Sequence, residues 1–112
     1  MTQIEADYRR GLALIAEGSY FAAHEALEDA WRAAAEAERD FFQGLVHVAV
    51  AWYQAQRRNR IGWERQHAKA QRRLLAYQPI HRGLDVGDLL SQLRACEDAY
   101  PDPPTLHLRL DR

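Results

Sequence analysis

Sixteen consecutive residues, Phe41 to Gln56, carry no charged side chain, although 28% of the chain is charged. A helix of this length extends about 24 Å, at about 1.5 Å per residue, and falls short of the roughly 30 Å hydrocarbon core of a membrane. We therefore expect this segment to be the buried central helix of a folded domain, and we expect no membrane span.

The polar residues of this segment fall on one side of the helix. On a helical wheel, Gln43, His47 and Gln54 lie within about 40° of each other, and nearly every other direction is apolar. The pattern predicts a thin polar stripe on a helix enclosed by its neighbours. Buried polar groups need hydrogen-bonding partners, so the stripe marks a place where a site could form.

The length of 112 residues, with 47% hydrophobic residues, fits one globular domain. Cys96 is the one cysteine, which allows neither an internal disulfide nor a cysteine-based zinc site. The opening residues MTQIEADYRR lack the apolar core of a signal peptide, so we expect a cytoplasmic protein. We expect a helical domain over residues 1–100 and a Pro-rich extended tail over residues 101–112.

Capping and helix-breaking residues predict four more helices. The expected N-caps are Thr2, Ser19, Asn59 and Asp85. Because residues 33–38 contain no Gly or Pro, the second helix is expected to continue to a turn near Asp40. The expected fold class is all-α: a compact bundle of about five helices, built from antiparallel helical hairpins around the central buried helix.

The end of the chain alternates leucine with polar residues after a proline-rich stop. Leu106, Leu108 and Leu110 follow Pro101, Pro103 and Pro104. One strand-like segment cannot form a sheet alone. The tail therefore either lies extended across its own bundle or reaches onto another subunit, and we favour a homodimer.

Basic residues are concentrated in residues 57–82, which contain eight basic and one acidic side chain. The wheel of the expected fourth helix places one set of residues inward: Trp63, His67, Ala70 and Leu74. It places a basic set outward: Arg65, Lys69, Arg72 and Arg73. This face could bind nucleic acid, but it shows no groove-reading motif, so we rank nucleic-acid binding third among the possible functions.

The expected second helix contains F-x-x-H-E-x-L-E-x-x-W, from Phe21 to Trp31. Its wheel places His24 and Glu28 inside the apolar face, with Glu25 at the rim. Burial without partners would be costly for both side chains. The natural partners come from the start of the next helix: Arg39, Gln43 and His47.

Three interpretations of this cluster stay open. The cluster can be a satisfied structural network that fixes how the helices face each other. It can be a divalent metal site formed by His24, Glu28 and His47, with H-E-x-x-E as a variant of the zinc-peptidase motif H-E-x-x-H. It can also border a small-molecule pocket, whose lining would be Trp31, Trp52 and Trp63.

Three motifs occur in order: the Phe21 to Trp31 motif, then R-D-F-x-Q-G-L from Arg39 to Leu45, then G-L-D-V from Gly83 to Val86. With these motifs the chain resembles the small helical proteins of domain-of-unknown-function family 309, over roughly residues 5–95. The resemblance implies a compact all-helical, cytoplasmic, mostly prokaryotic protein without an established activity. The signature residues correspond to His24, Glu25, Glu28, Trp31, Arg39, Gln43 and Gly44.

The function we expect is binding or interaction through the cleft between the second and third helices, with no catalytic residue assigned. The partner would be a small molecule, another protein or a second copy of the chain. The alternative is a metal-dependent, hydrolase-like enzyme that uses His24, Glu28 and His47.

Overall fold

The computed structural model describes residues 1–110 and consists mainly of helices, which confirms the predicted all-α fold. The helices are α1 (Gln3–Ala16), α2 (Tyr20–Ala33), α3 (Glu36–Gln56), α4 (Arg60–Leu74) and α5 (Val86–Ala95). A 3₁₀ turn, η1 (Leu75–Tyr77), and two short strands, β1 (Ile80–His81) and β2 (Leu84–Asp85), join α4 to α5.

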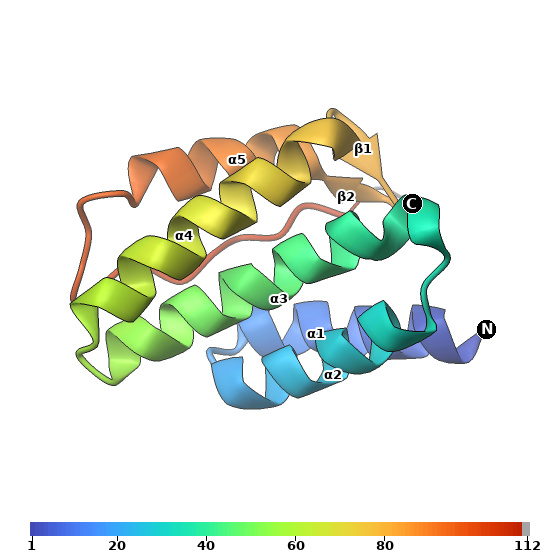
Figure 1. The fold of residues 1–112 in the computed structure, drawn as a ribbon, viewed down its shortest axis with the longest axis horizontal. Helices are drawn as coiled ribbons and strands as arrows, with labels where there is room; N and C mark the ends of the chain where they lie inside the picture. The colour runs from blue at the N-terminus through green and yellow to red at the C-terminus, as the bar shows by residue number, and fades with distance from the viewer. Residues whose placement is uncertain (111–112) are drawn as a thin grey trace.

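Helices α2, α3 and α4 lie side by side in one layer, with α3 in the middle and antiparallel to both neighbours (Figure 1). Helix α1 lies behind α2, and α5 lies behind α4, so a second layer covers the back of α3 (Figure 1). In this view the front of α3 has no helix over it.

The back and sides of α3 form the centre of the core. Phe41, Phe42, Leu45 and Trp52 are at most 1% exposed, which confirms that the uncharged segment is the central buried helix. The predicted inward residues of α4 are buried as well: Trp63, His67, Ala70 and Leu74. Among residues 1–110, no helix is long and apolar enough to cross a membrane.

The boundary between α2 and α3 differs from the prediction. Helix α2 ends at Ala33 and does not continue toward Asp40, because Ala34 and Ala35 adopt extended conformations with ψ of 146° and 153°. Helix α3 then begins at Glu36, five residues before the uncharged segment. No Gly or Pro marks this break; contacts from the distant segment 77–82, described below, hold the first turn of α3 in place.

Two glycines let neighbouring helices approach closely. A Cβ atom at Gly11 of α1 would lie 2.5 Å from Cγ of Leu27 on α2. A Cβ atom at Gly44 of α3 would lie 2.7 Å from Cγ of Leu74 on α4. Each glycine therefore forms a notch that a leucine fills, and the two notches fix the α1–α2 and α3–α4 pairs.

Three of the four expected N-caps make the predicted hydrogen bond. The side chains of Thr2, Asn59 and Asp85 accept from the backbone N–H groups of Glu5, Gly62 and Asp88. Ser19 precedes α2 but makes no side-chain cap hydrogen bond. Its hydroxyl lies 3.3 Å from a carboxylate oxygen of Glu17 instead.

Strands β1 and β2 pair through a two-residue turn formed by Arg82 and Gly83, whose φ values are 46° and 76°. Two consecutive positive φ values are typical of the type I′ turn that joins tight hairpins. This hairpin was not among the elements predicted from the sequence.

The tail lies across the bundle of its own chain. Trp52 Nε1 donates to the carbonyl oxygen of Pro104 at 3.0 Å, and Leu106 is only 2% exposed. Leu110 forms an antiparallel bridge with Leu84 of β2. Of the two placements considered for the leucine alternation, the structure has the one within the chain, and this contact gives no support for a tail-mediated dimer.

Candidate functional site

The Phe21 to Trp31 motif lies along the edge of α2 rather than in its buried face. The buried face is formed mostly by small residues: Tyr20, Ala23, Ala26, Leu27 and Ala30. His24 and Glu28, predicted to lie within the core, have side chains that are 22% and 35% exposed. The wheel was misdirected because three alanines, together with Tyr20 and Leu27, form the face that packs on the neighbouring helices, which leaves His24 and Glu28 at its edge.

His24 makes its polar contacts within α2. Its Nδ1 lies 3.1 Å from the carbonyl oxygen of Phe21, and its Nε2 lies 3.3 Å from Oε1 of Glu28. Arg32 approaches the same Glu28 oxygen at 3.6 Å. The exposed Glu25 lies on the solvent side of this row. The histidine and carboxylate therefore meet as predicted, but their partners are not those expected from α3.

His47 of α3 contacts α4 instead of α2. Its Nδ1 lies 2.7 Å from Oε1 of Gln66, an acceptor, so Nδ1 carries the proton. Burial lowers the pKa of His47, and the positive charges of Arg73, Lys69 and Arg72 lower it further. The hydrogen bond to Gln66 acts in the opposite direction and raises this pKa. Since the ordinary value is 6.5, the neutral form predominates at pH 7.

Two buried side-chain nitrogens have no hydrogen-bonding partner in the described chain: His47 Nε2 and Trp31 Nε1. Trp31 packs under Arg39, whose guanidinium carbon lies 4.6 Å from the ring centroid. Arg39 was predicted to neutralise Glu25 or Glu28, and this cation–π contact takes its place.

The metal and tryptophan-lined sites do not assemble from their predicted members. Within residues 1–110, no group of three or more His, Cys, Asp or Glu side chains is placed to hold a metal ion, so His24, Glu28 and His47 form no such set. Trp52 and Trp63 meet edge to face in the core with ring centroids 4.9 Å apart, and each is 1% exposed. They share no pocket with Trp31 among the pockets found.

The front of α3 forms what we call the α3 groove. Its floor is the uncharged stripe at helical spacing on α3: Gln43, Val46, His47, Val50, Tyr53 and Gln54. Most of these side chains are half-buried. Where the floor meets α2, a pocket of about 180 Å³ opens, lined by Phe21, His24, Val50, Tyr53 and Gln54.

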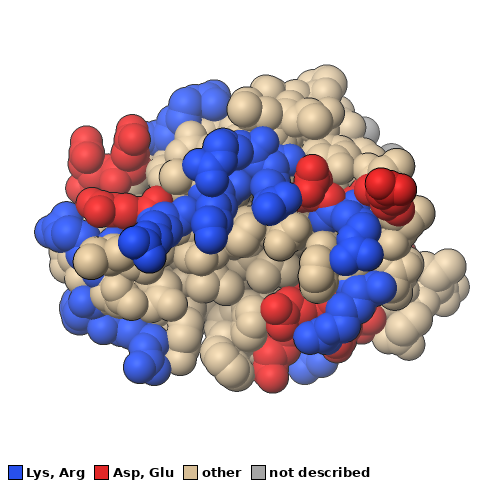
Figure 2. Space-filling model, viewed as in Figure 1, with Lys and Arg blue, Asp and Glu red and all other residues tan. Residues whose placement is uncertain are grey.

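The two sides of the groove differ in charge: the α4 side is mainly basic, and the α2 side carries acidic groups with basic ones among them (Figure 2). Along α4 runs a basic wall formed by Arg65, Lys69, Arg72 and Arg73. Along α2 runs a mainly acidic wall formed by Glu25, Glu28 and Asp29, with Arg32 bridging the last two. Between them the surface is uncharged (Figure 2). The sequence predicted the basic face but not its position beside this floor.

The two longer sequence motifs meet at this groove. A family model described as a domain of unknown function matches residues 8–66, which is more than half of the chain. The chain belongs to the DUF309 family. In this DUF309 domain, the matched residues include all of α2 and α3 and the first half of α4, and therefore the floor and the acidic wall. Comparison with curated proteins gave no match.

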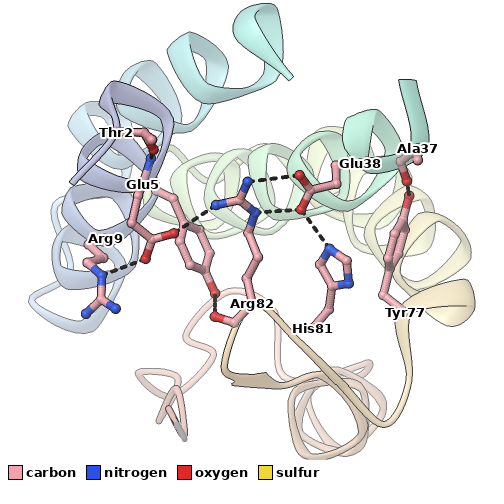
Figure 3. A network of polar contacts seen from close by, with 9 residues as sticks. Thr2, Glu5, Arg9, Ala37, Glu38, Tyr77, His81 and Arg82 are labelled. Carbon is pink, nitrogen blue, oxygen red and sulfur yellow. Dashed lines mark hydrogen bonds and ion pairs between the residues drawn. The ribbon is translucent and has the colours of Figure 1, made fainter. Parts of the chain in front are cut away.

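A second polar cluster, which the sequence analysis missed, joins the β1–β2 turn to α1 and α3 (Figure 3). Arg82 donates to Glu38 and to Glu5, and His81 Nε2 lies 2.9 Å from Glu38 Oε2. The hydroxyl of Tyr8 donates to the backbone carbonyl of Arg82 at 3.1 Å. These contacts span up to 77 residues, so no local pattern indicates them.

The charged side chains of this second cluster are paired with one another. The hydrogen bond from Arg82 lowers the pKa of Glu38 to about 2. Burial acts in the opposite direction, and the hydrogen bond with His81 lowers this pKa further. The carboxylate pair raises the pKa of Arg82 in return, chiefly through the Glu38 hydrogen bond. Because Arg82 and Arg9 together pair with the two carboxylates, Glu38 and Glu5, we regard the cluster as structural.

Proposed function

We propose that this DUF309 domain is a protein-interaction module whose binding site is the α3 groove. The observation that carries the proposal is the uncharged, half-buried stripe on the front of α3, which lies uncovered between two charged walls. A surface with an uncharged centre and a charged rim is typical of protein interfaces. An elongated groove of this kind accommodates a helix or another flat helical face.

The size of the pocket argues against a drug-sized ligand. Its volume of about 180 Å³ is well below the roughly 300–1,000 Å³ typical of small-molecule sites. The apolar side chains at its border, Phe21 and Tyr53, nevertheless give it the character of an anchoring point for one side chain of a partner. Phe21 is 50% exposed and packs on Tyr53, with ring centroids 5.4 Å apart.

The charges of the groove argue against nucleic acid as the partner. Single strands bind basic grooves that also offer exposed aromatic rings, but here the exposed ring of Phe21 lies on α2, the acidic side, and Trp63 of the basic helix α4 is 1% exposed. Arg73 is also paired with Asp40 at 2.7 Å. The acidic wall on α2 would repel a phosphate backbone lying along the floor. No observation favours the hydrolase-like alternative, since His47 contacts Gln66 on α4 and does not join the His24–Glu28 pair on α2.

A photo-crosslinking experiment tests the proposal. The photoreactive residue benzoylphenylalanine would replace Tyr53 in the groove, and as a control Arg94, which is exposed on α5. We expect irradiation of cells to give a covalent protein adduct of defined mass from position 53 and not from position 94. Val50→Lys on the variant carrying the probe at position 53 should abolish that adduct, because the new ammonium group would be desolvated in the interface. Equal labelling from both positions, or none from position 53, would overturn the proposal.

A further inference from the structure

We infer that the partner in the α3 groove is a second copy of this chain, bound groove to groove about a two-fold axis parallel to α3. This inference rests on the proposed function and names its partner. It is carried by the charge distribution of the groove, which is complementary to itself under this one symmetry operation.

The complementarity starts from the net charge of each wall. The basic wall on α4 has four cationic side chains, one of which, Arg73, is paired with Asp40 at the end of the floor. The acidic wall on α2 has three carboxylates, of which Glu28 and Asp29 share Arg32. Glu25 and Arg65 are exposed, and no ion pair between charged groups of the described chain includes either of them. Each wall therefore keeps charge available for a partner.

The walls also lie at the same level along α3. At one end of the floor, Trp31 of α2 lies under Arg39, and Arg73 of α4 is paired with the next residue, Asp40. Both neighbouring helices run antiparallel to α3, so they advance along it together (Figure 1).

Contacts farther along the floor keep this register. His24 of α2 and Val50 of α3 line one pocket, and Gln66 of α4 bonds His47, almost one turn earlier on α3. Glu25 on α2 and Arg65 on α4, each next to one of these contacts, therefore lie at nearly equal heights. One turn farther on, Asp29 on α2 and Lys69 on α4, each four residues beyond the first pair, lie at nearly equal heights as well.

This arrangement selects one two-fold axis. A face-to-face dimer of identical chains requires an axis in the plane of the interface. An axis parallel to α3 exchanges the two walls, so the acidic α2 of one copy faces the basic α4 of the other. An axis perpendicular to α3 places each wall opposite the same wall of the other copy, where like charges repel. About the selected axis, each floor residue faces the same residue of the other copy. No charges repel there, because the floor is uncharged.

Charge reversal with mixing tests this geometry. Glu25→Lys with Asp29→Lys makes both walls basic, and Arg65→Glu with Arg72→Glu makes both walls acidic; all four positions are exposed. We expect the wild type to have twice the 12.9 kDa chain mass by light scattering and each variant to associate at least about tenfold more weakly, because like charges then meet. An equimolar mixture of the two variants should restore the dimer as a heterodimer.

A matched control reverses two exposed charges away from the groove, Glu97→Lys with Asp98→Lys, and should leave the dimer intact. Circular dichroism verifies that every variant is folded. A wild type that is monomeric at all concentrations overturns the inference, as does a dimer that survives both reversals. A monomeric wild type that still gives a position-53 adduct with a different protein would leave the proposed function standing and remove only the second copy as its partner.

Discussion

Arg82 donates to both carboxylate oxygens of Glu38, with Nε 2.5 Å from Oε2 and Nη2 2.9 Å from Oε1. The same guanidinium donates through Nη1 to Glu5 at 2.8 Å. One side chain from the β1–β2 turn therefore binds the first turns of both α1 and α3. The left-handed conformation of Arg82, with φ of 46°, belongs to the turn that points this side chain toward the two helices.

Replacing Glu38 should weaken the fold and change its response to acid. The pKa of Glu38 is lowered from 4.5 to about 2, so its stabilising effect is complete above pH 4.5 and is lost as the pH falls toward 2. We expect Glu38→Gln to lower the free energy of unfolding at pH 7 by about 1–2 kcal/mol. Urea denaturation at a series of pH values should show that the variant loses less stability than the wild type between pH 4.5 and 2.

Glu36→Gln is the matched control, because Glu36 also lies in the first turn of α3 but is exposed. It should change the free energy of unfolding by less than about 0.5 kcal/mol. Equal effects of the two substitutions would mean that the helix dipole, and not Arg82, determines the contribution of Glu38.

Filling the Gly11 notch should destabilise the bundle even though alanine favours helices. A Cβ atom there would lie 2.5 Å from Leu27, a side chain with no exposed surface. Overpacking of this kind costs about 1–3 kcal/mol, which exceeds the roughly 1 kcal/mol gained by removing a helical glycine. We expect Gly11→Ala to lower the melting temperature. Gly87→Ala, whose Cβ would have its nearest neighbour at 3.6 Å, should leave it unchanged or raise it.

His47 should be coupled energetically to Gln66 and not to His24. We expect the double-mutant cycle of His47→Ala with Gln66→Ala to give a coupling of about 0.5–1.5 kcal/mol, since one hydrogen bond joins the two side chains. The cycle of His47→Ala with His24→Ala should be additive within about 0.5 kcal/mol. Unfolding by urea measures both. A strong His24–His47 coupling would restore the network between α2 and α3 that the sequence suggested.

The tail should stabilise the domain through Leu106. This side chain is 2% exposed, so Leu106→Ala should cost about 2–4 kcal/mol. Leu110 is 50% exposed, and Leu110→Ala should cost less than about 1 kcal/mol. Tryptophan fluorescence offers a second measurement of how the tail is bound, because the Trp52 indole donates a hydrogen bond to the carbonyl oxygen of Pro104, two residues before Leu106. Equal and small effects of both substitutions would show that the tail adds little to the core.

The fold could be predicted because its main signals are local. The uncharged run of α3, the caps at Thr2, Asn59 and Asp85, and the two-sided wheel of α4 each depend on neighbouring residues. The break at Ala34 could not be predicted in this way, because the groups that bind the start of α3, Arg82 and Tyr77, lie about 40 residues farther along the chain.

The polar residues of the α3 stripe could be located from the sequence, but not the side chains that they contact. A helical wheel gives the direction of His24 and His47 from their own helix axes, but not which neighbour occupies that direction or how closely it approaches. Gly44 lets Leu74 of α4 approach α3 closely, and His47, almost one turn farther along α3, bonds Gln66 of that same helix. The polar stripe thus lies at the surface, where it forms the floor of a groove.

The leucine-filled notches at Gly11 and Gly44 also affect how a partner would be received. Sliding α1 along α2, or α3 along α4, by one turn of about 5.4 Å would place a side chain against backbone where only a hydrogen now fits. Shear between these helices, a common way for bundles to adapt to ligands, is therefore blocked. A partner would meet an α3–α4 side of the groove already in its final shape, so little ordering of that side would oppose association.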